Sequence, residues 1–199
     1  MLKQKHTDYK FECGLDEAGR GCLAGPVTAA AVILKPNFKH ELIDDSKKLT
    51  KIKREELSKI IIKNSLDYSI EFVYPREIDE INILNASILA MHKCISKLRI
   101  KPEFLIVDGN RFKKYKDIMH KTIVKGDAKY LSIASASILA KYSRDIYMEK
   151  ISKKYPDYFW YKNKGYPTKQ HKDAIIRFGI TSHHRKSFKL FDEQLTIDF

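Results

Sequence analysis

Acidic side chains stand where three short apolar segments of the sequence end. Asp16 and Glu17 close the first segment, Asp108 closes the second and Asp127 follows the third, each close to a glycine. Short apolar segments are typical of buried strands, and open α/β folds build their sites at strand ends. Carboxylates gathered there would repel one another unless divalent cations neutralise them, and hard oxygen ligands suit Mg²⁺ or Mn²⁺. The pattern therefore indicates a two-metal site that hydrolyses a phosphodiester.

Most of these acids also have a purely structural explanation. Asp108 precedes Gly109, and most Asp-Gly pairs form turns. Asp127 precedes an expected helix, so its carboxylate would serve as a helix cap. The adjacent acids Asp16 and Glu17 fit neither explanation as well, because both lie just behind a buried strand. Spacing alone does not bring the four side chains together, so the sequence leaves both interpretations open.

Alternation and helical spacing define the elements that would position these acids. Strands are expected at 11–16, 26–34, 68–73, 104–107 and 122–124, and helices at 51–64, 81–98, 131–153 and 171–178. In the second helix, apolar residues recur every three or four positions from Ile81 to Leu98 and form one continuous stripe. A hairpin followed by alternating helices and strands predicts an α/β fold with a mixed sheet.

The basic charge of the chain is concentrated in one stretch. The formal net charge is +13, and residues 141–190 alone carry a net +9, whereas the last nine residues carry a net −3. Such a local excess is typical of proteins that bind a polyanion, most often nucleic acid. Lys outnumbers Arg 30 to 8, however, and an A·T-rich genome would give any protein this composition.

Cysteine usage and apolar runs bear on the compartment. Cys13, Cys22 and Cys94 are odd in number and widely spaced, so we expect buried free thiols and a reducing cytoplasm. No apolar run approaches the roughly 20 residues that a membrane-spanning helix needs, so no membrane segment is expected.

Seven motifs, in a fixed order along the chain, resemble those of bacterial ribonuclease HII. They lie at residues 14–21 with 24–27, 45–49, 77–84, 107–110, 124–127 with 135–141, 165–168 with His171, and 183–188. The resemblance implies an RNase H-like mixed sheet flanked by helices (residues 1–145), with a C-terminal helical substrate-binding part and tail (residues 146–199). It also implies a monomeric endonuclease that hydrolyses the RNA strand of RNA–DNA hybrids. Such an enzyme incises 5′ of single ribonucleotides in duplex DNA and leaves a 3′-hydroxyl and a 5′-phosphate.

The same motifs imply which acids hold the metal. By resemblance, Asp16, Glu17, Asp108 and Asp127 are the catalytic carboxylates that bind two Mg²⁺ or Mn²⁺ ions. Asp145 lies near Asp127 in the sequence and is the alternative for the last position.

Further motif residues are implied to contact the substrate. Gly19, Arg20 and Gly21 would read the 2′-hydroxyl of a ribonucleotide, because glycines let the backbone approach a sugar closely. Tyr166 would stack on the deoxyribose just past the ribonucleotide. The structural alternatives are a Gly-rich hairpin turn for the first three residues and a place in the core for Tyr166.

Three more residues are candidates for contact with the nucleic-acid backbone. Lys47 would contact a phosphate, and the alternative is a solvated lysine at a helix start. His171 and Arg185 would either contact the substrate or brace the site.

The end of the chain resembles a peptide that docks on a replication sliding clamp. This segment starts at Gln194 and ends at Phe199, with alternate apolar residues that fit an extended peptide in a pocket. A frayed tail or a last strand is the alternative.

Two other functions compete with ribonuclease HII. Another two-metal nuclease of the same broad fold would share the carboxylates, but would not need the Gly-Arg-Gly turn. A basic nucleic-acid-binding module would explain the charge, but not acids placed beside a polyanion.

Overall fold

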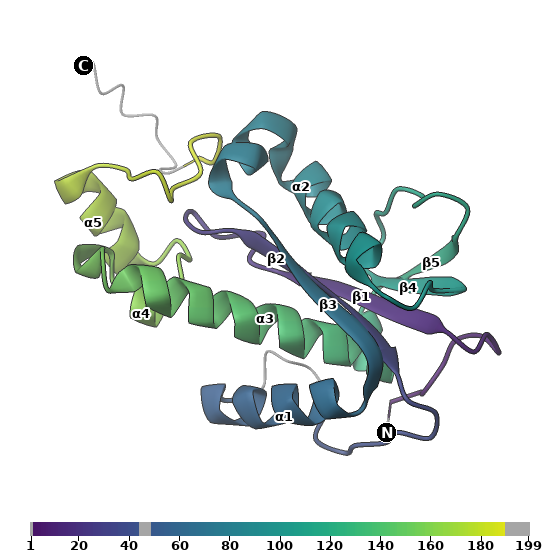
Figure 1. Ribbon diagram of the computed structural model, residues 1–199. Helices are drawn as coiled ribbons and strands as arrows, with labels where there is room; N and C mark the ends of the chain where they lie inside the picture. The colour runs from purple at the N-terminus through teal and green to yellow at the C-terminus, as the bar shows by residue number, and fades with distance from the viewer. Residues whose placement is uncertain (1, 44–48, 190–199) are drawn as a thin grey trace.

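The computed structural model describes residues 2–43 and 49–189 of the chain. Within this part, five strands form one mixed sheet in the order β3-β2-β1-β4-β5, as Figure 1 shows. Their bounds are β1 Glu12–Ala18, β2 Val27–Leu34, β3 Ser65–Val73, β4 Phe104–Asp108 and β5 Met119–Ile123. The first three strands pair antiparallel, whereas β4 runs parallel to both β1 and β5. The carboxyl ends of β1 and β4 therefore meet at one edge of the sheet.

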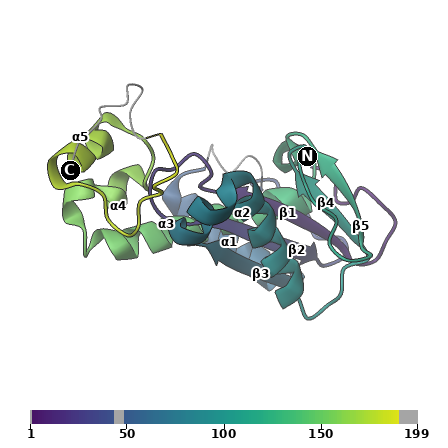
Figure 2. The ribbon, with the colours of Figure 1, turned by 90° about the horizontal axis from the view of Figure 1, so that it is seen from above.

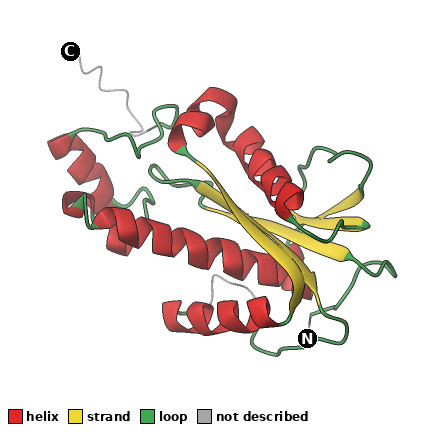
Figure 3. Ribbon diagram, in the orientation of Figure 1, coloured by secondary structure: helices red, strands yellow, loops and turns green. Residues whose placement is uncertain are grey.

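Helices cover both faces of this sheet (Figures 1 and 3). Their bounds are α1 Lys51–Lys63, α2 Pro75–Lys97, α3 Leu131–Ser152, α4 Trp160–Asn163 and α5 Lys169–Phe178, with short 3₁₀ turns η1 Gly126–Ala128 and η2 Pro156–Tyr158. Along β2, Ala29 and Ala31 pack in the core cluster under α2, while Ala30 and Val32 pack in the cluster with α1 and α3. Strand alternation thus gives the sheet two apolar faces. The predicted α/β fold with a mixed sheet and flanking helices is confirmed.

Small residues allow α3 to lie directly on the sheet. A Cβ built on Gly14 of β1 would come within 2.3 Å of the Ser132 carbonyl carbon on α3, so only glycine fits there. Ser135, Ala136 and Ala140 on α3 are fully buried. This close packing fixes the position of β1, and with it the acids that β1 carries, relative to α3.

The C-terminal part packs beyond the end of the sheet, where Figure 2 shows α4 and α5 beside the end of α3. Its own apolar cluster includes the single tryptophan, Trp160, which is fully buried, together with Met148 and Leu23. The helix α3 runs continuously through residues 145 and 146, so the two predicted parts share one helix. The division at that point stays a prediction.

The helix α2 differs from its predicted extent. It begins at Pro75, where proline suits the first helical turn, rather than near Ile81. Asn82 then interrupts it with a φ of 65°, and its side-chain oxygen accepts from the backbone N–H groups of Leu84 and Asn85. The apolar stripe from Ile81 revealed only the part beyond this kink.

Two further expectations concern cysteines and membranes. Cys13, Cys22 and Cys94 are all free and buried, as predicted. Among the residues that the structure describes, no helix is long and apolar enough to span a membrane.

Candidate active site

Two acids stand side by side at the carboxyl ends of parallel strands. Leu15 of β1 is in register with Val107 of β4, so Asp16 and Asp108 are the next residues on the two strands. Neighbouring strands lie about 4.8 Å apart, which makes the two carboxylates close neighbours on the same face of the sheet. Strand register therefore brings together two of the acids whose meeting the sequence left open.

Burial and repulsion both act on Asp16. Burial raises its pKa well above its usual range, and the charges of Glu17 and Asp108 raise it further. A hydrogen bond from Ser137 of α3 partly opposes this rise, so α3 contacts the carboxylate directly. A buried acid beside two others needs a proton or a cation, and this is the electrostatic pattern expected of a functional site.

Glu17 is the next residue on β1, at the end of the strand, and belongs to the same group of acids. Burial raises the pKa of Glu17, while Arg20, 3.1 Å away, counteracts the rise. Glu17 and Asp108 line one small pocket of about 30 Å³ together with Arg20 and Arg111. That volume suits a water-sized group or an ion.

Asp127 belongs to η1, which is bonded to Asp108. The backbone N–H of Gly126 donates to Asp108 Oδ1 at 2.7 Å, so η1 is anchored on the carboxylate of β4. Asp127 itself is buried. The alternative acid, Asp145, is also buried but forms ion pairs with Arg54 at 3.1 Å and Lys141 at 3.8 Å. These contacts commit Asp145 to a structural ion pair and leave Asp127 as the fourth candidate.

The donor set of these acids fits a hard divalent cation. Within residues 2–43 and 49–189, no three His, Cys, Asp or Glu side chains already converge on one point as metal ligands. Mg²⁺ commonly takes only one or two carboxylates, with waters and substrate phosphates in its other positions, so it needs no such cage. Asp16 and Asp108, oxygen donors in strand register, suit that mode of binding.

The Gly-Arg-Gly turn begins two residues after Glu17, and two buried arginines lie against it. Arg185 is fully buried and donates to the carbonyl oxygens of Gly19 at 2.7 Å, Arg20 at 2.8 Å and Gly25 at 2.9 Å. Arg144 of α3 is almost fully buried, and a Cβ on Gly19 would lie 2.0 Å from its Nε. The contacts of Arg185 favour the bracing alternative over substrate contact.

Gly21 differs from Gly19 in its surroundings. Gly19 has a φ of +90°, whereas Gly21 is exposed, and a Cβ there would meet nothing within 4 Å. Arg20 between them is also exposed. Protein packing therefore requires glycine at position 19 but leaves open space at position 21.

Tyr166 lies near this turn, with its backbone held by a histidine relay. The Trp160 N–H donates to His171 Nε2 at 2.9 Å, so His171 is neutral and its Nδ1–H donates to the Tyr166 carbonyl at 2.9 Å. Tyr166 as a whole is 39% exposed, and its ring centre lies 5.9 Å from the Arg144 guanidinium. Tyr166 is thus presented to solvent, while buried His171 positions it.

His184 completes the relay behind His171. The Thr181 N–H donates to His184 Nδ1 at 2.9 Å, and His184 Nε2 lies 3.2 Å from His171 Nε2, the atom that accepts from Trp160. Burial lowers the pKa of His184 to about 4, with a further contribution from His171. Both histidines are therefore neutral hydrogen-bonding groups in the fold.

Some candidates lie elsewhere or were missed. Lys47 and the tail from Gln194 to Phe199 fall outside the described residues. Arg144 and Ser137 were not predicted, because an arginine or serine in a helix is ordinarily a solvated or packing residue. Their buried contacts with the turn and with Asp16 appear only in the tertiary structure.

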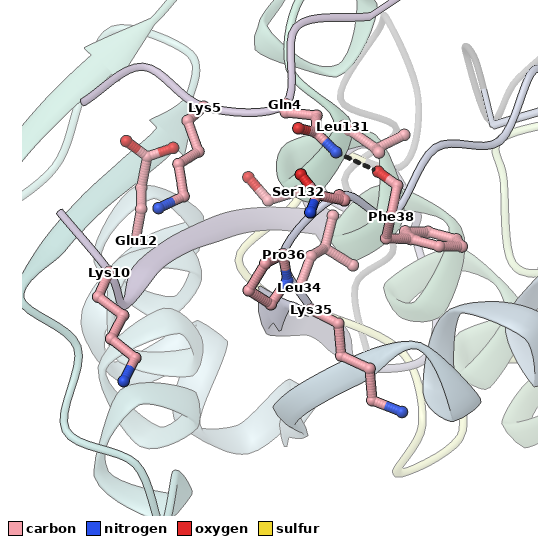
Figure 4. A pocket seen from close by; sticks show the side chains of 11 residues that line it. Gln4, Lys5, Lys10, Glu12, Leu34, Lys35, Pro36, Phe38, Leu131 and Ser132 are labelled. Carbon is pink, nitrogen blue, oxygen red and sulfur yellow. Dashed lines mark hydrogen bonds between the residues drawn. The ribbon is translucent and has the colours of Figure 1, made fainter. Parts of the chain in front are cut away.

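A second small pocket lies at the other end of β1 (Figure 4). Glu12, at the start of β1, lines it together with Gln4, whose side-chain amide donates to the Phe38 carbonyl at 2.7 Å. Residues of the N-terminal segment and of the loop after β2 line this pocket. Most of β1 separates it from Asp16. It is not part of the acidic site.

Comparison with known proteins identifies the class. The ribonuclease H2 of Pyrococcus horikoshii superposes with a TM-score of 0.77 at 27% identity, covering 90% of this chain and 94% of that one. The structure of a PCNA:RNase HII complex from Archaeoglobus fulgidus contains a chain with a TM-score of 0.75 at 28% identity, covering 93% and 98%. The fold is the RNase H-like fold, and the protein is a nuclease.

The family follows from sequence. The family model for Ribonuclease HII matches residues 13–191. Ribonuclease HII of Christiangramia forsetii is 59% identical over 94% of both chains, and that of Parabacteroides distasonis is 56% identical over 100% of both. The chain belongs to the ribonuclease HII family, and it is a ribonuclease H that acts as an endonuclease on RNA–DNA hybrids.

Proposed function

We propose that this enzyme incises duplex DNA on the 5′ side of a single embedded ribonucleotide, leaving a 3′-hydroxyl and a 5′-phosphate. One observation carries the proposal: the Gly-Arg-Gly turn begins just beyond the end of β1, two residues after Glu17, and is bonded to the C-terminal part that presents Tyr166. The turn proposed to recognise the ribonucleotide and the Tyr166 proposed to recognise the next nucleotide would therefore flank the acids.

We assign two divalent ions to Asp16, Glu17, Asp108 and Asp127. Membership of a metal-dependent family and the carboxylate donor set support this assignment. When bound, Mg²⁺ or Mn²⁺ would supply an activated water and stabilise the leaving oxygen. The chain's own contribution is to hold Asp16 and Asp108 in strand register, with Ser137 orienting Asp16.

The turn would recognise the ribose. Its exposed residues, Arg20 and Gly21, are free to face a duplex, and open space at Gly21 lets a sugar reach the backbone. Arg20 would bind the neighbouring phosphate in exchange for part of its contact with Glu17. Gly19 has no side chain, and this lets the turn pack against the Arg144 side chain.

Tyr166 would read the nucleotide that follows. Its half-exposed ring suits stacking on a deoxyribose, which a 2′-hydroxyl would disturb. We place His171 and Arg185 among the positioning residues, since both are fully buried and bonded to protein groups. Lys47 as a phosphate contact remains a proposal from the motif alone.

One assay distinguishes this function from its competitors. A duplex with one ribonucleotide is incubated with the enzyme in Mg²⁺, in Mn²⁺ and in chelator, and the cut is mapped at nucleotide resolution. Metal-dependent incision 5′ of the ribonucleotide supports the proposal. Cutting of plain DNA indicates another two-metal nuclease, and binding without cutting indicates a binding module.

We also propose that the segment from Gln194 to Phe199 docks on a sliding clamp. Its resemblance to clamp-binding peptides supports this, as does the PCNA complex of the archaeal relative. Deleting residues 194–199 should abolish clamp binding measured by calorimetry, and unchanged binding would refute the role. The three buried free cysteines support a reducing, cytoplasmic location, and we propose a monomer as the working form.

A further inference from the structure

The carboxylate of Asp79, on the first turns of α2, is hydrogen-bonded to the two residues that follow Arg185. Asp79 accepts hydrogen bonds from the backbone N–H of Lys186 at 3.0 Å, the backbone N–H of Ser187 at 2.9 Å and the Ser187 hydroxyl at 2.6 Å. Burial opposes ionisation, but the hydrogen bonds from Ser187 and Lys186 and the charge of Lys186 together outweigh it and lower the pKa of Asp79. An ionised acceptor with three donors is a strong local anchor.

Arg185 is the residue immediately before this anchor. Its guanidinium bonds to the carbonyls of Gly19, Arg20 and Gly25, and it lies 5.0 Å from the ring of Phe188 just beyond the anchor. Asp79 therefore fixes the backbone of Lys186 and Ser187, which immediately follows Arg185.

Backbone bonds join the same two segments. The Arg185 N–H donates to the Leu23 carbonyl at 2.8 Å, and the Gly25 N–H donates to the His183 carbonyl at 2.8 Å. Residues 183–185 therefore hold the turn through the Arg185 guanidinium, and hold the segment just after the turn through the backbone bonds to Leu23 and Gly25.

We infer that Asp79 is a positioning residue for the Gly-Arg-Gly turn. It holds residues 186–187 on α2, this placement sets Arg185, and Arg185 sets the carbonyls of Gly19 and Arg20 beside the acids. The inference extends the proposed function, because it assigns the turn's accuracy to a residue that never meets the substrate. It also gives a role to the motif at residues 77–84.

Amide hydrogen exchange of residues 19–25 tests this linkage without relying on activity. In Asp79→Ala, exchange in that segment should rise about fivefold or more as local opening becomes easier. Asp67→Ala is the matched control, because Asp67 also accepts from two backbone N–H groups, those of Arg99 at 2.6 Å and Ile100 at 2.8 Å, beyond the other end of α2. It should leave residues 19–25 unchanged. Fluorescence of the single, buried Trp160 reports that the C-terminal part stays folded.

The milder variant Ser187→Ala keeps the test decisive if Asp79→Ala does not fold. It removes only the 2.6 Å hydroxyl bond and should raise exchange at residues 19–25 by a smaller factor. Unchanged exchange in the foldable variants, or an equal rise in Asp67→Ala, would overturn the inference.

Kinetics supply the functional consequence. The kcat/KM of Asp79→Ala on the single-ribonucleotide duplex should fall about tenfold, with a smaller fall on a continuous RNA–DNA hybrid, and Asp79→Asn should recover part of the loss. Equal losses on both substrates would contradict a role in the turn's accuracy. If the wild type fails to incise at single ribonucleotides, the proposed function fails, while the exchange result still decides the linkage.

Discussion

Asp16 and Asp108 occupy adjacent positions on β1 and β4, one step beyond the parallel pair Leu15 and Val107. Register therefore brings together two carboxylates that are 92 residues apart in the sequence. The helix α3 packs closely on β1 because Gly14 has no side chain, and the hydrogen bond from Ser137 of α3 opposes only part of the rise in the pKa of Asp16. The fold thus places two mutually repelling carboxylates where a bound cation would relieve their repulsion.

Replacing Asp16 by asparagine should separate stability from catalysis. Asp16→Asn removes a buried charge that Glu17 and Asp108 oppose, so the melting temperature in chelator at pH 8 should rise by about 2 °C or more. Incision should fall at least about 1,000-fold, while duplex binding stays within about twofold. Thermal unfolding, a cleavage assay and fluorescence anisotropy measure these three properties. Near-normal cleavage would refute the metal assignment.

The two glycines of the turn should respond differently to alanine. Gly19→Ala places a Cβ against the bonded Arg144 side chain at a φ of +90°, so the protein should lose about 1–3 kcal/mol of stability. Gly21→Ala meets no protein atom and should melt like the wild type, yet its kcat/KM at a single ribonucleotide should fall about tenfold. Normal kinetics in Gly21→Ala would show that no sugar packs there.

Tyr166 should matter most at an RNA-to-DNA junction. Tyr166→Ala should reduce incision of junction substrates about tenfold, the scale of one lost stacking contact, with a smaller loss on continuous hybrids. Tyr166→Phe keeps the ring and is expected to retain the preference. Equal losses on both substrates in the alanine variant would rule out the stacking role.

The histidine relay predicts a dependence of stability on pH. His184 is neutral in the fold, with a pKa of about 4, but takes a proton near pH 6.5 when unfolded. Its contribution to stability is therefore present above pH 6.5 and is lost as the pH falls towards 4. His184→Gln should show a shallower decline of melting temperature across this window. Identical slopes for variant and wild type would contradict the account.

Much of this architecture is visible in the sequence, because alternation and helical spacing report burial. The acids at the ends of β1 and β4 were found as strand-end residues, and their meeting needed only the parallel register. The kink at Asn82 could not be predicted, because the apolar stripe continues past it in the sequence. The bond from the Leu84 N–H to the Asn82 side chain, which caps the helix there, is seen only in the structure. Arg144 and Arg185 gave no sign of burial, since arginines are ordinarily solvated and only tertiary carbonyl contacts reveal their role.

The most direct test of the central claim is calorimetric titration of Mn²⁺ into the wild type, Asp16→Asn, Asp108→Asn and the double variant, with Asp145→Asn as the buried control. One shared site predicts that either single variant weakens binding at least about tenfold, and that the double variant is far less affected than the sum of the two losses. Asp145→Asn should bind Mn²⁺ like the wild type, because Asp145 pairs with Arg54 and Lys141. Independent, additive losses at the two acids, or an equal loss in the control, would contradict a metal site built on the Asp16 and Asp108 register.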